Sequence, residues 1–512
     1  MSRPSTPEYQ VRSHSTEEEE QAVSAHEAGE EYDVIVIGTG PVGQTVAQRV
    51  RSAGLTVAAV ERELVGGECS YWACIPSKAM LRPVTALADA RRVGGAREAV
   101  TGQVDATAVL ARRDKWVTDW DDRGQAQFLK DIGADLIRGH ARLDGPRRVS
   151  VEIPRGSTLS LTARHAVVVC TGSRPNFPEL AGLADVRPWT NREATDSPKV
   201  PGRLAIIGGG GVGVEMATAW HGLGSSVTLL AQTEGLLPKM EPFVGEMIAR
   251  SYTEAGIDVR IGVTVEGMRR PDRTGPVTLS LEGGAELEAD EVLLAIGRRP
   301  LTYDIGLQTV GLEPGSWLEV DDTCAVRAVA GDRWLYALGD VNGRALLTHQ
   351  GKYQARVAGA VIAARAAGRP VDPAPWGPHA TTADSRAVPQ VFFCDPQVGA
   401  VGLTADQAER AGHRIRVVDV DTGGKVAGAG LYADGYTGRA RMVVDEDHER
   451  LLGVTMVGPA IEELIHSATV AVAAQVPVSR LWHAVPCFPS ISEVWLRLLE
   501  AYRDTTDARQ WR

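Results

Sequence analysis

The chain has 512 residues, of which 44% are apolar and 23% charged, and these fractions exclude a disordered, collagenous or coiled-coil protein. This length predicts two to four domains of roughly 100–200 residues each. The formal net charge of -11 argues against binding to nucleic acid or to an anionic membrane surface. No apolar run reaches the roughly 18 residues of a membrane span, and six cysteines are too few for a disulfide-stapled secreted scaffold, so we expect a cytoplasmic protein.

Residues 1–30 differ from the rest of the chain. They are polar, include four consecutive glutamates at 17–20, and lack the apolar stretch of a signal peptide. We predict a solvated, disordered acidic tail, with binding of a partner as the alternative.

The first ordered unit follows this tail. The β-branched apolar run Asp33–Ile37 predicts a buried parallel strand, a helix is expected over 44–52, and a second strand is expected over 55–60. Three glycines in the spacing Gly-x-Gly-x-x-Gly separate the first strand from the helix: Gly38, Gly40 and Gly43. The second strand leads into Glu61. The glycines allow a tight turn and close approach of a pyrophosphate, and an acid at Glu61 can accept hydrogen bonds from ribose hydroxyls. This unit therefore predicts a dinucleotide site.

Two cysteines lie close together just after Glu61. Four residues separate Cys69 from Cys74, and a loop of this length can close into a disulfide if Cys74 begins a helix. A helix N-terminus also favours the thiolate and so activates such a pair for exchange. Two structural thiols or a metal clip are the alternatives that the spacing leaves open.

The glycine-containing unit occurs a second time. A strand is predicted over 203–207, a helix over 214–223, and a further strand over 226–230. The same glycine spacing recurs between them at Gly208, Gly210 and Gly213. Two such units predict two bound dinucleotides and electron transfer between them.

The second unit lacks the acid of the first. Ala231 stands 18 residues after its last glycine, where a carboxylate would hold the ribose 2′-hydroxyl of NAD and repel the 2′-phosphate of NADP. No arginine follows directly, since Gln232 and Thr233 come next. The sequence therefore permits both nucleotides, and we expect NADPH rather than NADH.

The cysteine segment decides among the alternatives by its resemblance to a family. The segment resembles the redox-active loop of the flavoprotein disulfide reductases, which include dihydrolipoamide dehydrogenase, glutathione reductase and mercuric reductase. Its sequence is Gly66-Gly-Glu-Cys69-Ser-Tyr-Trp-Ala-Cys74-Ile-Pro-Ser-Lys78. The resemblance extends over nearly the whole chain from about residue 31. Further segments match the family's FAD contacts and the end of its nicotinamide nucleotide domain: Thr171-Gly172-Ser173, Gly297, and Gly339-Asp340. Gly67 is also expected at the cofactor.

This resemblance implies an α/β fold with two doubly wound (Rossmann-like) dinucleotide-binding domains plus a C-terminal α+β dimerisation domain. It implies a homodimer whose active site is shared across the interface. The expected division of the chain is a tail at 1–30, FAD-binding parts at 31–187 and 301–375, an NAD(P)-binding domain at 188–300, and an interface domain at 385–512.

The resemblance also implies catalytic roles. FAD and NADPH (or NADH) are the expected cofactors, with Cys74 as the flavin-facing thiol and Cys69 as the thiol that meets the substrate. Lys78 is expected to pair with Glu215, and its cationic side chain suits a flavin that becomes anionic on reduction.

The chain departs from the family near its C-terminus. Disulfide-reducing members carry an acid–base histidine before a proline, but Phe488 stands there and leaves Glu493 with nothing to orient. His483 is a poor substitute because of its position, and Cys487 is either a third thiol or a packed small residue. No C-terminal cysteine pair typical of mercuric reductases is present. Tyr71 and Trp72, between the redox cysteines, are either packed or a stacking face.

The sequence thus predicts an FAD-dependent NAD(P)H oxidoreductase that passes electrons through a redox-active Cys69–Cys74 disulfide to an unidentified small-molecule acceptor. Direct reduction of a quinone or a metal ion by the flavin is the alternative. A flavin-bearing redox sensor is the non-enzymatic hypothesis.

Overall fold

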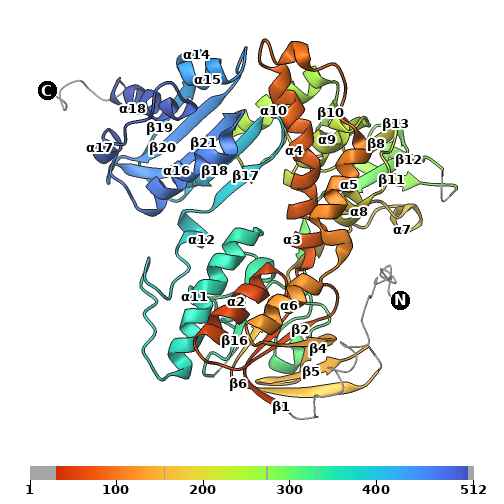
Figure 1. Ribbon diagram of the computed structural model, residues 1–512, viewed down its shortest axis with the longest axis vertical. Helices are drawn as coiled ribbons and strands as arrows, with labels where there is room; N and C mark the ends of the chain where they lie inside the picture. The colour runs from red at the N-terminus through yellow and green to blue at the C-terminus, as the bar shows by residue number, and fades with distance from the viewer. Residues whose placement is uncertain (1–29, 155, 273–274, 330, 505–512) are drawn as a thin grey trace. The chain divides into compact units, whose positions relative to one another are not determined.

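The computed structural model describes residues 30–154, 156–272, 275–329 and 331–504 (Figure 1). The predicted acidic tail lies outside these residues except for Glu30. The chain forms two compact units. The first unit contains the chain up to Tyr71, Val117–Arg174 and Arg299–Thr381. The second unit contains Trp72–Trp116, Pro175–Arg298 and the chain from Thr382 onward. The five-part division expected from the sequence stays a prediction.

The first unit is built on a mostly parallel sheet. Its parallel strands, in spatial order, are β3 (Asp135–Arg138), β2 (Val57–Glu61), β1 (Glu30–Ile37), β6 (Thr158–Val169) and β16 (Leu335–Ala337). β5 (Arg148–Glu152) and β4 (His140–Leu143) extend it in antiparallel fashion. β1 contains the run Val34–Ile37, which is buried because the sheet is covered on both faces.

Helices cover this sheet. The longer helices are α2 (Pro41–Ser52), α6 (Arg123–Asp131) and α11 (Thr348–Ala366). Val46 and Val50 of α2 share a core cluster with Ala358 and Val361 of α11. The shorter elements of the unit are α3 (Gly67–Tyr71), η2 (Thr118–Trp120), η3 (Leu307–Val310) and η4 (Gly339–Asn342), and β7 (Ser173–Pro175) and β15 (Arg298–Pro300) lie where the chain passes between the units.

The second unit contains another parallel sheet. Its strands, in spatial order, are β10 (Asp258–Ile261), β9 (Ser226–Ala231), β8 (Arg203–Ile207) and β14 (Glu291–Leu294). A three-stranded antiparallel sheet follows in β11 (Val265–Arg269), β12 (Val277–Leu281) and β13 (Glu286–Ala289). The helices here are α7 (Leu183–Val186), α8 (Asn191–Asp196), α9 (Gly211–Gly222) and α10 (Pro242–Ala255).

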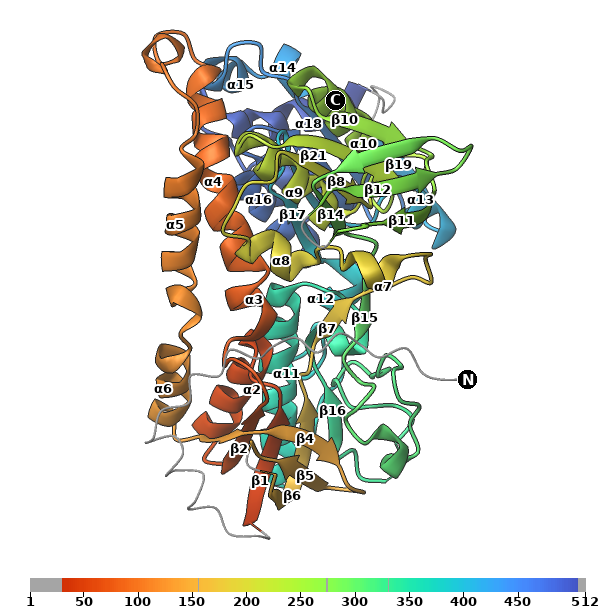
Figure 2. The same ribbon diagram turned by 90° about the vertical axis from the view of Figure 1, so that its right-hand side faces the viewer.

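Two long helices, α4 (Cys74–Arg91) and α5 (Ala106–Trp116), run side by side in this unit (Figure 1, Figure 2). The short helix η1 (Arg97–Ala99) lies between them in the chain. α4 packs so closely on α9 that a Cβ at Gly222 would collide with the side chain of Val84. α4 carries Cys74 and Lys78 against the second dinucleotide-type fold.

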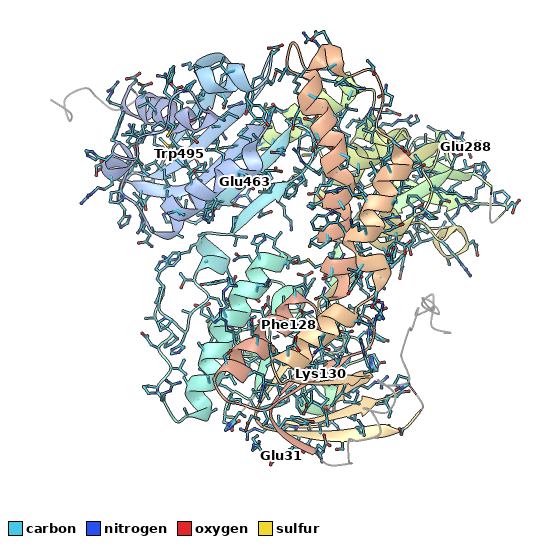
Figure 3. The ribbon with its side chains drawn as sticks, in the orientation of Figure 1. Glu31, Phe128, Lys130, Glu288, Glu463 and Trp495 are labelled. Atoms are coloured by element: carbon cyan, nitrogen blue, oxygen red, sulfur yellow. The ribbon has the colours of Figure 1, made fainter. Side chains whose placement is uncertain are left out.

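The C-terminal part of the second unit is an antiparallel sheet with helices. Its strands, in spatial order, are β17 (Pro389–Phe392), β18 (Gln397–Gly402), β21 (Arg450–Gly458), β20 (Arg439–Asp445) and β19 (Ile415–Asp421). The helices are α12 (Ala383–Arg386), α13 (Ala405–Arg410), α14 (Thr422–Lys425), α15 (Ala427–Tyr432), α16 (Ile461–Ala473), α17 (Val478–Leu481), η5 (Ile491–Glu493) and α18 (Val494–Asp504). Figure 3 marks Glu463 on α16 and Trp495 on α18, whose indole donates a hydrogen bond to Ser467 of α16 over 2.9 Å.

The expected α/β class with two doubly wound sheets and an α+β C-terminal part is confirmed. The predicted strand 203–207 coincides with β8, but both glycine-motif helices begin three residues earlier than predicted, at Pro41 and Gly211. The third glycine of each motif therefore lies in the first helical turn, where only glycine fits against the end of the preceding strand. Within the described residues, no helix is long and apolar enough to cross a membrane.

A candidate redox and dinucleotide site

The first glycine loop connects β1 to α2. A Cβ at Gly38, which has a φ of +93°, would lie 2.6 Å from the carbonyl oxygen of Cys170, and a Cβ at Gly43 would collide with the carbonyl of Gly38. A Cβ at Gly40 would meet nothing within 4 Å. The outer glycines are therefore needed for packing, whereas Gly40 leaves an open approach to the N-terminus of α2. That approach suits a phosphate.

Glu61 is the last residue of β2 and lies beside this loop. Its Oε2 accepts hydrogen bonds from the backbone N–H and the hydroxyl of Thr39, both over 2.8 Å. Its Oε1 accepts hydrogen bonds from the N–H groups of Arg62 and Glu63 over 2.9 Å. An ionised carboxylate has about four acceptor sites, and these contacts fix its orientation at the carboxyl edge of the sheet.

The other expected FAD contacts also lie in the first unit. Ser173 donates a hydrogen bond from its hydroxyl to Oδ2 of Asp340 over 2.6 Å. The buried hydroxyl of Thr171 has no hydrogen-bond partner among the described residues. A Cβ at Gly172 would meet nothing within 4 Å, and one at Gly67 would lie 3.1 Å from Cα of Gly40.

These observations test whether the residues of the first unit fit FAD. An orphaned buried hydroxyl at Thr171 costs free energy unless a partner is bound. The open space at Gly40 and Gly172 leaves room for a phosphate and its sugar. The residues present therefore fit a dinucleotide, with Gly339 and Asp340 on the neighbouring η4.

The second glycine loop connects β8 to α9. A Cβ at Gly208 would collide with the carbonyl of Ala295, and one at Gly213 with the carbonyl of Gly208. Gly210 again has nothing within 4 Å of its Cβ position, as does Gly297, which has a φ of +107°. The loop thus repeats the geometry of the first and fits a second dinucleotide.

Ala231 ends β9 just as Glu61 ends β2. Its side chain is fully buried, and the two residues after it, Gln232 and Thr233, are exposed. No carboxylate occupies the ribose position of the second unit.

The two cysteines of the redox loop lie on consecutive helices. Cys69 is in α3 of the first unit, and Cys74 is the first residue of α4 in the second unit. Cys74 begins a helix, so the condition under which this spacing can close into a disulfide is met. The N–H groups of the first turn of α4 favour negative charge at this position, which is what an exchanging thiol requires.

Lys78 lies one turn further along α4 and forms the expected pair with Glu215 of α9. Its Nζ is 2.6 Å from Oε2 of Glu215, and it also lies 4.8 Å from the ring centroid of Phe393. Oε1 of Glu215 accepts a hydrogen bond from the backbone N–H of Phe393 over 3.0 Å. No motif in the sequence indicates that Phe393 contacts this ion pair. Burial raises the pKa of the neighbouring Cys394 thiol well above its ordinary value, so this cysteine stays protonated.

The residues between the cysteines have separate environments. Tyr71 is 2% exposed and its hydroxyl donates to the carbonyl of Val65 over 3.2 Å, which supports the packing alternative for this ring. The carbonyl of Trp72 accepts hydrogen bonds from the side chains of Asn191 (2.9 Å) and Thr195 (3.1 Å) of α8. The guanidinium of Arg192 lies 4.2 Å from the centroid of the Trp72 ring. The one sequence feature that points to these contacts with Trp72 is the pattern Thr190-x-x-Glu193, which is typical of a helix N-terminus and caps α8.

The C-terminal segment shows what replaces the family's histidine. Phe488 is 75% exposed, and His483 and Cys487 are exposed as well. Glu493 is 5% exposed, and its Oε1 contacts Arg497 at 2.5 Å. Its buried Oε2 has no hydrogen-bond partner among the described residues.

Two dinucleotide-type folds, with a cysteine pair on helices that follow one another in the chain, define a class of redox enzyme that binds two nucleotides. Residues 32–367 match the family described as pyridine nucleotide-disulphide oxidoreductase, and residues 388–498 match its dimerisation domain. The chain belongs to this family. Its members are oxidoreductases that use FAD and NAD(P)H, as expected from the sequence.

Individual relatives cover nearly the whole chain. A dihydrolipoyl dehydrogenase of Haloferax volcanii is 31% identical over 484 residues, which are 91% of this chain and 95% of the relative. A mercuric reductase of Staphylococcus aureus is 30% identical over 469 residues, which are 91% of this chain and 81% of the relative. The solved structure of the HOCl-induced flavoprotein disulfide reductase RclA from Escherichia coli superposes with a TM-score of 0.77. It covers 92% of this chain and 99% of its own at 24% identity, so it supports the fold alone.

Proposed function

We propose that this protein is an FAD-dependent NAD(P)H oxidoreductase that passes electrons through a Cys69–Cys74 disulfide to a small-molecule acceptor. The start of α4 carries the proposal. It places Cys74 at a helix N-terminus and, one turn on, Lys78 in an ion pair with Glu215. The glycine loops at Gly40 and Gly210 support two nucleotide sites.

FAD held by the residues of the first unit would supply, from a hydride of NAD(P)H, the two electrons that open the disulfide. Those two electrons and two protons convert the disulfide to two thiols. When the acceptor is a disulfide, Cys69 attacks one of its sulfurs as a thiolate and releases the other as a thiol. Cys74 then attacks the mixed disulfide at Cys69, releases the second thiol of the acceptor and closes the Cys69–Cys74 disulfide again. The helix N-terminus favours the thiolate of Cys74, and Glu215 holds the ammonium of Lys78 in place.

The acceptor is not identified, and Phe488 bears on its class. A phenylalanine cannot protonate a leaving thiol, and a positioned acid–base contributes about 10²–10⁴ in rate. We therefore expect slow turnover with glutathione disulfide or lipoamide. A quinone or a metal ion, which needs no such proton donor, is the second candidate acceptor.

We further propose NADPH as the preferred nucleotide, because Ala231 presents no carboxylate to a 2′-phosphate.

We also propose a homodimer that shares its active site across the interface. The match of residues 388–498 to the family's dimerisation domain supports the homodimer. A groove of about 560 Å³ lies on this domain. It is lined by Leu431, Tyr432, Leu464 and Ile491, among others, and Leu431 is 71% exposed. A second copy is the expected occupant. We propose a cytoplasmic location as well.

The function is tested by anaerobic titration of the purified yellow protein with NAD(P)H. One equivalent should open the disulfide and produce a long-wavelength thiolate–flavin absorption band, and Cys74→Ser should abolish that band. Alkylation with iodoacetamide followed by mass spectrometry should label Cys69 and Cys74 only after reduction. The buried thiols of Cys170, Cys324 and Cys394 serve as unlabelled internal controls. A colourless protein that takes up no FAD, or labelling of Cys69 and Cys74 before reduction, would contradict the proposal.

A further inference from the structure

Three successive glycines of the second loop face three different surroundings. A Cβ at Gly209 would lie 3.0 Å from Cβ of Ala231 and 2.9 Å from the side chain of Leu236. A Cβ at Gly210 would meet nothing within 4 Å. A Cβ at Gly211, the first residue of α9, would lie 2.7 Å and 3.0 Å from two ring atoms of Phe392.

This order gives the second nucleotide site a direction. The end of the second strand, here Ala231, marks the adenosine ribose in a dinucleotide fold, and the pyrophosphate lies at the helix N-terminus. Gly209 therefore lies on the adenosine side, and the open position of Gly210 lies at the pyrophosphate. Gly211 and the ring of Phe392 lie on the remaining side, which is left for the nicotinamide.

Phe392 is held in place by its neighbours. It ends β17, where it pairs with Val398 of β18. The next residue, Phe393, donates its backbone N–H to Glu215, one turn along α9 from Gly211. The end of β17 is thus fastened along the first turn of α9, and the partly buried ring of Phe392 packs against the core cluster of the second unit.

We propose that Phe392 is a positioning residue for the nicotinamide half of NAD(P)H, and that Gly211 is a glycine because a side chain there would displace the Phe392 ring. This inference rests on the proposed function, since it assumes a nucleotide at the second loop. An aromatic ring offers a planar apolar face to a planar ligand, and offset stacking of this kind adds to area burial. The ring determines how the nicotinamide is held and leaves the adenosine half untouched.

The experiment measures equilibrium binding of NADP⁺ and of 2′-phospho-ADP-ribose, which lacks the nicotinamide. NAD⁺ and ADP-ribose form the parallel pair. Binding to the FAD-loaded protein is followed by calorimetry, and the rate of flavin reduction by NADPH is measured in a stopped-flow instrument. FAD content and melting temperature report whether each variant folds.

Phe392→Ala should weaken NADP⁺ binding by about fivefold to tenfold and leave 2′-phospho-ADP-ribose within about twofold of wild type. Phe392→Tyr, which keeps the ring, should retain most of the NADP⁺ affinity. Gly211→Ala should weaken NADP⁺ by displacing the ring. The double variant Gly211→Ala/Phe392→Ala should bind no worse than Phe392→Ala, because the collision is gone.

Gly210→Ala is the matched control, since its Cβ meets open space in the same loop. It should weaken both ligands, and its effect should add to that of Phe392→Ala. Equal loss of both ligands in Phe392→Ala, no loss at all, or additive effects of Gly211→Ala and Phe392→Ala would overturn the inference. A wild-type protein that binds none of the four ligands would overturn the proposed function instead.

Discussion

At the scale of single residues, the two oxygens of the buried Glu493 carboxylate have different surroundings. One carboxylate oxygen contacts Arg497, and the other is buried with no hydrogen-bond partner in the described part of the chain. An unpaired buried acceptor costs about 1–3 kcal/mol. We expect a histidine at position 488 to supply the acid–base that the thiol exchange lacks.

Phe488→His should therefore raise the rate with glutathione disulfide or lipoamide at least about tenfold. A misplaced imidazole would reduce this gain. Steady-state kinetics with both disulfides measure it, with Phe488→Leu as a control of similar apolar character. In the double variant Phe488→His/Glu493→Gln the gain should shrink, because the imidazole loses its carboxylate. A wild type that already reduces these disulfides rapidly would contradict the argument and direct attention to His483 or Cys487.

At the scale of elements, the ends of β2 and β9 carry the difference between the two nucleotide sites. In the first unit Thr39 and Glu61 form two hydrogen bonds. In the second unit the same two positions are Gly209 and Ala231, which bring no polar side chain. Ala231→Glu should raise the ratio of kcat/KM for NADH to that for NADPH, because a carboxylate repels the 2′-phosphate.

The matched control is Ala231→Gln, which has the size of glutamate without its charge and should leave this ratio nearly unchanged. Kinetic constants for both nucleotides in all three proteins check the prediction. A ratio that shifts equally in both variants would show that the size of the side chain at position 231, and not its charge, sets the preference between the nucleotides.

The ionisation of Asp33 in β1 predicts how the stability of the fold depends on pH. Burial raises the pKa of Asp33, but hydrogen bonds from Arg164 (2.7 Å) and from Thr56 (2.8 Å and 3.0 Å) outweigh it and hold this pKa at about 2. The folded pKa lies below the ordinary value of 3.8, so the ionised carboxylate stabilises the fold above pH 3.8. This stabilisation is lost as the pH falls through about 2.

Asp33→Asn should accordingly lower the melting temperature at pH 7, and the difference from wild type should narrow steadily below pH 4. Thermal melts of both proteins between pH 3 and pH 7 measure this narrowing. A difference that stays constant down to pH 3 would show that Asp33 acts through its shape rather than through its charge.

At the scale of the whole molecule, the proposed homodimer leaves a testable mark on the dimerisation domain. Leu431 is 71% exposed and lines the groove between α15, α16 and the segment around Ile491. In a two-fold dimer each substitution acts twice, so Leu431→Asp should weaken self-association at least about tenfold. Sedimentation equilibrium measures the dimer dissociation constant. Tyr303→Asp, at a 63% exposed aromatic residue outside this domain, is the control and should leave it unchanged.

The features that the sequence predicted correctly are mostly local in origin. The buried strand around Ile35 follows from β-branched apolar residues, and the two loops follow from glycines, of which the first and third in each motif leave no room for a side chain. The helix boundaries were less accurate, because α2 and α9 begin inside the glycine motifs where the packing of the third glycine decides.

The sequence by itself therefore determined the family, the two nucleotide folds, the cysteine pair and the missing histidine, because each depends on residue type at short spacing. Only the tertiary structure decided that Phe392 lies against Gly211, that Asn191 holds the carbonyl of Trp72, and that one oxygen of Glu493 lacks a hydrogen-bond partner within the described part of the chain. Some of these features join elements that are far apart in the chain. The others depend on how the surrounding chain packs. Such packing follows from how whole elements bury their apolar faces, and neither periodicity nor motif spacing encodes it.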